Sequence, residues 1–355
     1  MLIIMKKILF VCGIPPHPVH GKFAKSIGAD FFNYNDKSFG KKLKNLWKIP
    51  KGYDIYLSEG LFNYVVLSKM VGHLDKKAQI INLFADPRIY QIIDGRRFNF
   101  NKEKVEKYPF LKKIFVKKLI KKLDKGICVG KFEENILNKL SKIPTENIPA
   151  FIERKEFFKG TSKLKENNIL FIAGGPDYYY KGLDFLLKVF SKIQKEFPNS
   201  KLFVIGGGWE KFRKNVKTKN VFFEGKKDLK GIKKLMDKCS LCCHFGRGDT
   251  FPVSTLEAMA SGMPCFVSNS TGTKEVVNKI SKDFIFKMDE GKVAKDIIKY
   301  MKKNTKEKKK IGQKFKKIAS FYNEKNCINL FKENFSRLIK ENESIDDKSP
   351  NKNCR

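Results

Sequence analysis

The sequence predicts an α/β protein with two doubly wound domains of parallel sheet. Short β-rich runs that end in glycine or a polar turn alternate with longer helix-forming stretches, the pattern of parallel βα units. The alternation breaks near the middle of the chain and then restarts, and 355 residues are enough for two hydrophobic cores. Two such domains would face each other across a crevice, where open α/β sheets bind their ligands.

Four β-rich runs predict the strands of a first domain, residues 1–150. They are KILFVCGI (7–14), YDIYLSEG (53–60), AQIINLFAD (78–86) and KGICVGK (125–131). The segment 143–159 contains two prolines and is interpreted as a linker.

Five further runs predict a second domain, residues 151–319. They are NILFIAGG (168–175), KLFVIGGG (201–208), NVFFEG (220–225), CSLCCHFG (239–246) and MPCFVSN (263–269). A lysine-rich helical region follows over 292–317, and 326–340 has apolar residues at helical spacing. The polar tail 341–355 is expected to be disordered.

Composition favours a cytoplasmic globular protein. No run of about 18 apolar residues predicts a membrane-spanning helix. The apolar stretch near the start is short and lacks the cleavage site of a signal peptide, so we interpret it as a buried strand. Most of the eight cysteines lie in strand-like runs, which favours reduced, buried thiols. The run CSLCCH (239–244) lacks the second ligand pair of a zinc site, and no metal is expected.

The net charge of +37 comes from 74 lysines and arginines against 37 acids. Such a charge favours contact with phosphate, on nucleic acid or on an anionic membrane, or it reflects a lysine bias of the whole chain. No nucleic-acid-binding motif is visible, so no specific nucleic acid is expected. The run FVKKLIKKL (115–123) fits a membrane-surface helix. It also fits a helix packed on its own sheet by Phe115, Val116, Leu119, Ile120 and Leu123, which we favour.

The stretch GDTFPVSTLEAMASGMP (248–264) resembles the signature of the group 1 glycosyltransferase family. That family comprises retaining enzymes that use nucleotide-activated sugars on a GT-B fold. Its pattern is an acid, seven residues, a glutamate and then Ala-Met-Ala-x-Gly-x-Pro, matched here by Asp249, Glu257 and 258–264. The similarity covers most of 168–280, including TGTKEVV (271–277). It implies that a terminal helix within 320–340 crosses back to pack on the first domain.

The resemblance implies a donor site in the second domain. Glu257 would accept hydrogen bonds from the ribose hydroxyls, and Asp249 would accept from hydroxyls of the donor sugar. Lys181 would stabilise the charge that develops on the leaving phosphate. The first N–H groups of the helix that follows the loop, with its dipole, can face the diphosphate. The other residues assigned to this site are Phe251, Val253, Ser254 and Gly182.

The first domain offers weaker candidates on the acceptor side. A glycine-containing loop, HGK (20–22), would let Gly21 approach the diphosphate closely. His20 and Asp86 are expected at strand ends that face the crevice, where either could orient the acceptor or polarise its hydroxyl. They join Asp249 and Lys181 as candidate catalytic residues. The chain has no Asp-x-Asp pair, so protein cations would replace a metal, and no cofactor is expected beside the nucleotide-sugar donor.

Three departures from the family pattern leave alternatives open. The turn 174–176 lacks the arginine that is frequent there, and Pro252 replaces a glycine and removes one N–H group. The stretch NLFADPR (82–88) has no histidine where many relatives have one. The leading hypothesis is a metal-independent retaining glycosyltransferase with front-face attack, acting on an unidentified acceptor. The alternatives are an inactive binding or scaffold protein and, ranked last, a basic nucleic-acid-binding protein.

Overall fold

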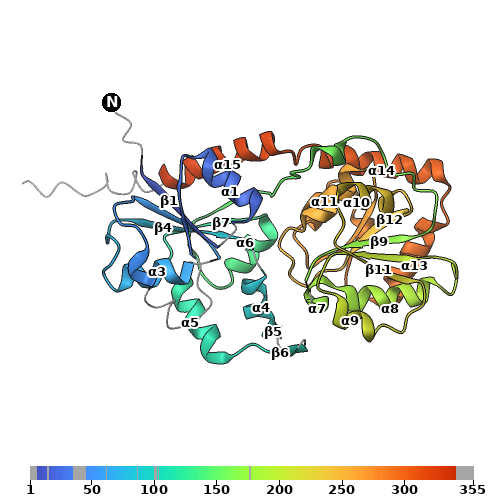
Figure 1. The fold of residues 1–355 in the computed structure, drawn as a ribbon, viewed down its shortest axis with the longest axis horizontal. Helices are drawn as coiled ribbons and strands as arrows, with labels where there is room; N and C mark the ends of the chain where they lie inside the picture. The colour runs from blue at the N-terminus through green and yellow to red at the C-terminus, as the bar shows by residue number, and fades with distance from the viewer. Residues whose placement is uncertain are drawn as a thin grey trace, which may run out of the picture.

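The chain folds into two parallel β-sheets covered by helices, seen side by side in a computed structural model (Figure 1). The structure describes residues 6–13, 16–34, 45–60, 62–85, 87–99, 102, 104–175 and 177–340. Asp86 and the tail 341–355 therefore lie outside the described residues, as does Pro176.

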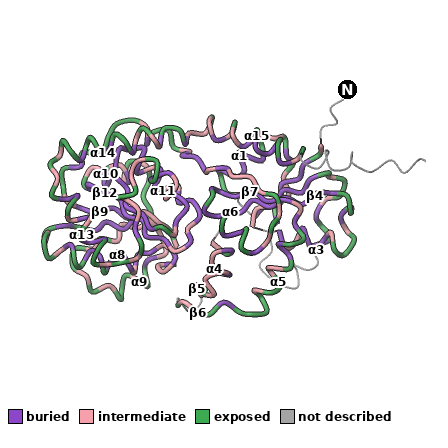
Figure 2. The backbone as a smooth tube through the Cα atoms, turned by 180° about the vertical axis from the view of Figure 1, so that it is seen from behind, coloured by how far each residue is buried: buried purple, intermediate pink, exposed green. Residues whose placement is uncertain are grey.

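The first sheet has six parallel strands in the order β2-β1-β3-β4-β7-β8. The chain runs from β1 outward to β2 and returns to the other side of β1, so the order reverses between β1 and β3, where a doubly wound sheet binds ligands. The central strands are apolar on both faces and buried, as Figure 2 shows. Their bounds are β1 (Ile8–Cys12), β2 (Asp30–Asn33), β3 (Ile55–Glu59), β4 (Gln79–Phe84), β7 (Lys125–Cys128) and β8 (Thr145–Asn147).

Helices cover both faces of this sheet, and a short antiparallel hairpin extends from it toward the second sheet (Figure 1). The helices are α1 (Pro18–Ser26), α3 (Phe62–Met70), α4 (Arg88–Asp94), α5 (Phe110–Ile120) and α6 (Lys131–Leu137), with a 3₁₀ turn η1 (Asn45–Lys48). The hairpin pairs β5 (Arg96–Asn99) with β6 (Lys104–Lys107).

The second sheet repeats the arrangement with the order β11-β10-β9-β12-β13-β14. Its order reverses between β9 and β12, so the loops after these two strands meet at one place. The strands are β9 (Ile169–Ile172), β10 (Leu202–Ile205), β11 (Val221–Gly225), β12 (Leu241–His244), β13 (Cys265–Ser268) and β14 (Ile285–Phe286). The helices are α7 (Tyr178–Lys181), α8 (Leu183–Ile193), α9 (Glu210–Lys214), α10 (Leu229–Met236), α11 (Val253–Ala260), α12 (Lys274–Asn278), α13 (Glu290–Met301) and α14 (Thr305–Ala319), with a 3₁₀ turn η3 (Lys282–Phe284).

The predicted fold class is confirmed, and the predicted linker is partly wrong. Within 143–159 the chain forms β8, the edge strand of the first sheet, and later the 3₁₀ turn η2 (Lys155–Phe158). The strand is short and polar, so it carries no periodic signal. It is held by pairing with β7 and by Glu134, which accepts from Thr145 Oγ1 and Asn147 Nδ2 at 2.7 Å each.

The terminal helix α15 (Glu324–Lys340) crosses back to the first domain, as the resemblance implied (Figure 1). Its Phe331 ring stacks on Phe23 of α1 with centroids 4.7 Å apart. Asn334 Nδ2 donates to the carbonyl of Asn147 at 2.8 Å, which fixes the helix beside β8. The core of the N-terminal domain is therefore completed by the last helix of the chain.

The predicted packing of 115–123 is confirmed for its second half only. Leu119, Ile120 and Leu123 are buried, and Val116 is partly buried. Phe115 was expected on the same buried arc, but it is 48% exposed. The helix starts earlier than the predicted segment, at Phe110, and its first turns extend beyond the surface that the sheet can cover.

Candidate functional site

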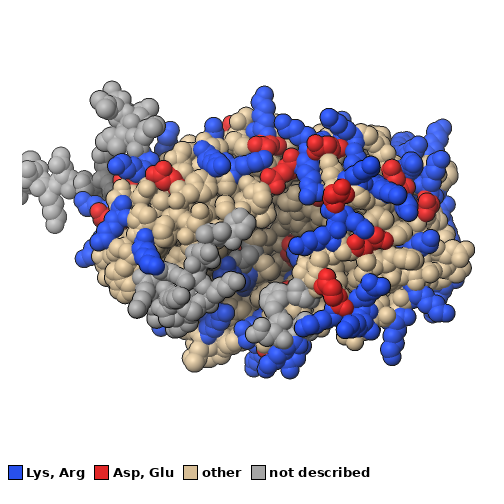
Figure 3. Space-filling model, in the orientation of Figure 1, with Lys and Arg blue, Asp and Glu red and all other residues tan. Residues whose placement is uncertain are grey.

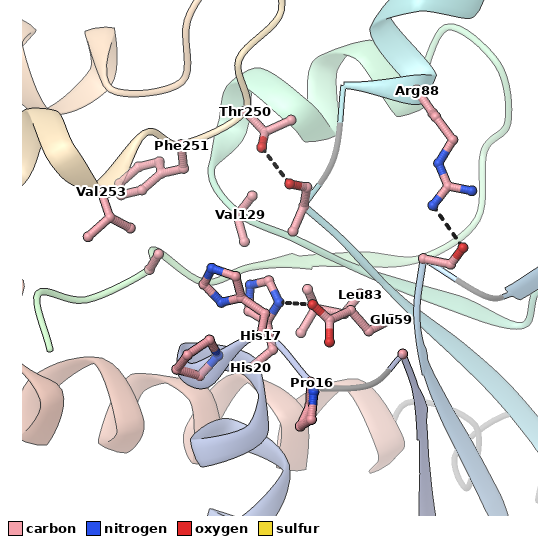
Figure 4. Close-up of a pocket in the computed structure, with 15 residues that line it drawn as sticks. Pro16, His17, His20, Glu59, Leu83, Arg88, Val129, Thr250, Phe251 and Val253 are labelled. Carbon is pink, nitrogen blue, oxygen red and sulfur yellow. Dashed lines mark hydrogen bonds and ion pairs between the residues drawn. The ribbon is translucent and has the colours of Figure 1, made fainter. Parts of the chain in front are cut away.

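A cavity of about 640 Å³ lies between the two domains, at the carboxyl ends of their strands. Its N-terminal wall comes from the loops after β1, β3, β4 and β7, and its C-terminal wall is the loop that enters α11. Thr250, Phe251 and Val253 belong to that loop and line the cavity (Figure 4). A hollow between the domains is also visible in Figure 3. This is the crevice that the two strand orders predict.

The acid before α11 sits in a compact charged cluster. Asp249 Oδ2 lies 2.8 Å from Lys181 Nζ, which belongs to the end of α7. The same oxygen lies 2.9 Å from His244 Nε2, at the end of β12, in an ion-pair contact rather than an aligned hydrogen bond. The structure thus brings two predicted residues, 68 positions apart, into direct contact.

The cluster keeps Asp249 ionised. Burial by itself would raise the pKa of this carboxyl, but the Lys181 ammonium and the His244 ring outweigh burial, and the pKa falls below its ordinary value. Burial likewise disfavours the charged form of Lys181, yet Asp249 and Asp177 raise the pKa of Lys181. An ionised carboxylate can only accept hydrogen bonds, which suits hydroxyl donors of a ligand.

Glycine is required where α7 meets α8. Gly182 has φ +77°, and a Cβ atom there would lie 1.9 Å from the carbonyl oxygen of Phe245. No side chain fits this approach, so the glycine lets α7 place Lys181 against the end of β12. Gly182, predicted to bind donor, thus acts on the site by positioning its neighbour, and a contact with donor stays a prediction.

Pro252 does not interrupt the start of α11. It is the residue before the first turn, and its carbonyl accepts from Thr255 N–H at 3.0 Å. Val253 and Ser254 belong to the first turn of α11, where the backbone N–H groups have no carbonyl partner within the helix. Ser254 Oγ donates to the carbonyl of Ile172 at 2.8 Å and fixes α11 to the end of β9. The loss of one N–H at residue 252 therefore leaves the helix start intact.

Glu257 lies on α11, one helical turn after Val253, but it is not among the residues that line the cavity. It is largely buried, and burial raises its pKa to about 7, while Arg154 of the inter-domain connection opposes that shift. A carboxyl that titrates near neutral pH inside an empty site is costly to keep ionised without hydrogen-bond donors. Its predicted role toward ribose hydroxyls stays a prediction.

The N-terminal wall carries a histidine–glutamate pair. His20 Nδ1 and Glu59 Oε1 are 2.5 Å apart, and both residues line the cavity (Figure 4). Glu59 Oε2 is buried and has no hydrogen-bond partner among the described residues. His17 stacks near His20 with ring centroids 4.4 Å apart, and burial lowers the pKa of His17. The wall thus presents one unused carboxylate oxygen.

Two predictions on this wall need correction or stay open. The segment HGK (20–22) was expected in a loop, but it lies inside α1, where Gly21 N–H donates to the carbonyl of His17. A Cβ atom at Gly21 would make only ordinary contacts, so helical packing does not require a glycine there. The histidine's side chain faces the cavity from the helix. Asp86 lies outside the described residues, so the prediction for it stays open.

Three contacts join the domains around the cavity. Thr250 Oγ1 donates to the carbonyl of Ala85 at 2.9 Å, and Tyr180 Oη donates to the carbonyl of Arg96 at 2.7 Å. Glu275 accepts from the N–H groups of Lys131 and Phe132 at the start of α6. These contacts hold α7, the loop after β12 and the start of α12 against the N-terminal domain.

Arg247, which the sequence analysis overlooked, is a cation that lies beside α7. Its guanidinium pairs with both carboxylate oxygens of Asp184, at 2.8 and 3.1 Å, and lies 4.2 Å from the centroid of the Tyr179 ring. It locks the loop before Asp249 onto α7 and α8. The missing arginine of the turn 174–176 is therefore not simply replaced, because Arg247 is already engaged.

Other functional groups were missed because single-chain patterns do not display them. His244 was considered only as part of the run CSLCCH, and Glu59 ends a strand without any motif. A polar residue at the end of an apolar strand was the available signal for both. Among the described residues, His, Cys, Asp and Glu side chains form no group of three that could hold a metal ion.

Comparisons with known proteins agree with this architecture. The model of the family "Glycosyl transferases group 1" matches residues 153–318. A curated relative, an uncharacterized glycosyltransferase of Haemophilus influenzae, is 25% identical over 169 residues. That match spans 46% of this chain and 47% of the relative, about half of each.

Solved structures resemble the chain over almost its whole length. The chain superposes on sucrose-phosphate synthase from Thermosynechococcus elongatus with a TM-score of 0.70 at 14% identity, over 95% of this chain and all of the other. HepE from Anabaena, solved in complex with UDP-glucose, gives a TM-score of 0.67 at 14% identity, over 94% of this chain and all of the other. At such identities the likeness concerns the fold. Residues 153–318 therefore match the group 1 family of glycosyl transferases, and the two facing domains of the chain have the GT-B fold.

Proposed function

We propose that the protein is a retaining glycosyltransferase that moves a sugar from a nucleotide-sugar donor to an acceptor hydroxyl without a metal ion. The contact of Asp249 with Lys181 and His244, beside the inter-domain cavity, carries the proposal. In this contact a negatively charged carboxylate and a cation lie together at the point where the strand order of the second sheet reverses. A sugar needs the carboxylate as a hydrogen-bond acceptor, and a diphosphate needs the cation.

The donor would be held by groups that are already in position. Asp249 accepts from hydroxyls of the sugar, and Lys181 moves from the carboxylate to the diphosphate. The first N–H groups of α11 add a positive dipole end to the same phosphates. As the bond between sugar and phosphate breaks, negative charge grows on the leaving group, and the ammonium of Lys181 stabilises it. Glu257 anchors the ribose through its carboxylate.

The acceptor would enter on the N-terminal wall. Glu59 Oε2 is buried without a hydrogen-bond partner among the described residues, so it would accept from a hydroxyl that reaches it, while His20 holds the other oxygen of the same carboxylate. Glu59 is the one carboxylate among the described residues that line the cavity. The pairing with His20 suits Glu59 to orienting the acceptor hydroxyl rather than to attacking the sugar itself. Without a protein nucleophile, the acceptor hydroxyl would attack the sugar on the same face that the leaving group vacates.

The experiment is a ligand panel on purified protein in the presence of EDTA. UDP-glucose, GDP-, ADP- and CMP-sugars are compared with the bare nucleotides by thermal unfolding. A donor at about 100 times its dissociation constant adds about 2.7 kcal/mol to the free energy of unfolding. Asp249→Asn should still bind the bare nucleotide but lose the extra shift from the sugar. Asp296→Asn on α13, a helix that contributes no residue to the cavity lining, is the matched control.

Three outcomes separate the alternatives. Transfer to an acceptor with retained anomeric configuration, followed by NMR, supports the proposal. Donor binding without hydrolysis or transfer would indicate a binding or scaffold protein. If no sugar nucleotide shifts the unfolding of well-folded protein at low salt, the donor site is absent and the proposal fails.

A further inference from the structure

The outer face of α5 carries large apolar side chains in its first two turns. Phe110 is 71% exposed and Leu111 79%, and Ile114 and Phe115 are 37% and 48% exposed. Residues at these spacings lie on one side of a helix, so the four form a continuous stripe. Single exposed apolar residues are ordinary, but a cluster of four on one helix face indicates a contact surface. We call these four residues the α5 tip.

Lysines continue the same face beyond the α5 tip. At 100° per residue, Lys118 points in the same direction as Leu111 and Ile114. Lys121 and Lys122 follow directly after the helix ends at Ile120, and all three lysines are exposed. The opposite face packs inward through Leu119 and Ile120. The outward face is therefore apolar at its start and cationic at its end.

Two arginines lie near the first turn of α5. Burial, followed by the charges of Arg97 and Arg88, lowers the pKa of Lys112 in that turn. Arg88 also lines the inter-domain cavity. The positive charge around α5 is therefore not confined to the lysines at the end of the helix.

We propose that α5 docks this protein on an anionic lipid bilayer, with the α5 tip inserted among the acyl chains and Lys118, Lys121 and Lys122 on the headgroups. A bilayer interface offers an apolar layer beside a layer of negative charge, in the order that this helix face displays. A second copy of the chain is a poor occupant, because it would bring lysines of two strongly basic molecules together. Nucleic acid offers no site for four apolar side chains.

The test is flotation of the full chain with vesicles of neutral phosphatidylcholine and of phosphatidylcholine with 30 mol% phosphatidylglycerol, without any donor. The wild type should float with the anionic vesicles. Phe110→Ser/Leu111→Ser should lower the partition coefficient at least tenfold, because two inserted side chains are lost. The triple variant K118Q/K121Q/K122Q should lower it by about a hundredfold, since each lysine near the surface contributes about fivefold.

Matched variants away from α5 separate docking from general basic adhesion. Phe222→Ser/Phe321→Ser removes two exposed phenylalanines, and K214Q/K217Q/K219Q removes three exposed lysines. Both should bind vesicles like the wild type, and thermal unfolding verifies that all variants are folded. Equal losses in the two lysine variants would overturn the proposal in favour of uniform charge attraction. A concentration-dependent dimer that the α5 tip variant abolishes would assign the surface to a second copy instead. Because no donor is present, either result leaves the transferase proposal untouched.

Discussion

The two walls of the inter-domain cavity use their acids in opposite ways. Behind the C-terminal wall, Asp249 precedes the lining residue Thr250 and contacts Lys181 and His244, so its charge is balanced before any ligand arrives. On the N-terminal wall, Glu59 has one oxygen on His20 and one buried oxygen without a partner among the described residues. The first arrangement suits a ligand of fixed chemistry such as a diphosphate sugar. The second leaves one acceptor position open for a hydroxyl.

The C-terminal wall should show the largest effect. Lys181→Met removes the cation that would stabilise the leaving phosphate, and we expect kcat to fall by about 10²–10³. Initial rates of sugar transfer from the donor found in the ligand panel measure this. Lys188→Met, on the exposed side of α8 and paired with Glu290 at 3.3 Å, should keep full activity. Equal rates for Lys181→Met and the wild type would remove the functional difference between the walls.

The pH dependence of donor binding sharpens the same comparison. In the empty site the pKa of Glu257 is about 7, and hydrogen bonds from ribose hydroxyls favour its ionised form. Donor affinity should therefore fall as the pH drops below 7, up to about tenfold per pH unit, and stay level above pH 8. Calorimetric titrations from pH 5.5 to 8.5 test this, and Glu257→Gln should bind weakly at every pH. An affinity that is flat in the wild type would contradict the role of Glu257.

The same carboxyl has a consequence for stability. Its folded pKa lies above its unfolded one, so the folded state holds the proton more tightly, and this contribution to stability is lost as the pH rises through 7. Glu257→Gln should accordingly raise the unfolding temperature at pH 8, where the wild type buries a charge, and change it little at pH 4. A lower unfolding temperature at pH 8 would show that the charge is compensated in the empty site.

On the N-terminal wall we expect a smaller effect confined to the acceptor. Glu59→Gln removes the charge that would bind an acceptor hydroxyl, and a hydrogen bond to a charged group contributes about 1.5–3 kcal/mol. The KM of the acceptor should rise about tenfold or more, while the dissociation constant of the donor stays constant. Glu333→Gln, exposed on α15, serves as the control. If Glu59→Gln weakens donor binding as well, the division of labour between the walls is wrong.

The contact that holds the walls together should give the smallest effect. Glu275 accepts from two N–H groups at the start of α6, and Glu275→Gln keeps the shape but removes the charge there. We expect about 0.5–1 kcal/mol less stability, typical of one charge at a helix start. Chemical denaturation measures the loss, and small-angle scattering shows whether the domains separate. An unchanged midpoint and scattering profile would mean that Thr250 and Tyr180 suffice to join them.

Much of the fold is visible in the sequence because it depends on neighbours along the chain. The central strands are continuous apolar runs, and the structure confirms all nine of those predicted, with shorter ends. The stretch 248–264 carries its acid, turn and helix within 17 residues, so one segment reveals much of the donor wall. Some short strands leave no clear periodic signal in the sequence. They are the hairpin strands β5 and β6, and the strands β2, β8 and β14, which lie at sheet edges.

What the sequence by itself determined is the set of local elements, the two-domain alternation and the family signature around Asp249 and Glu257. Only the tertiary structure decided which side chains meet. His20 finds Glu59 across 39 positions, and Glu275 reaches α6 across more than 140. It also decided that α5 buries its last turn and exposes its first, because the sheet ends beneath it. Local apolar patterns determine which residues near one another in the sequence are buried together, so they predict strands and helices. Contacts between residues far apart in the sequence exist only once both sheets have formed.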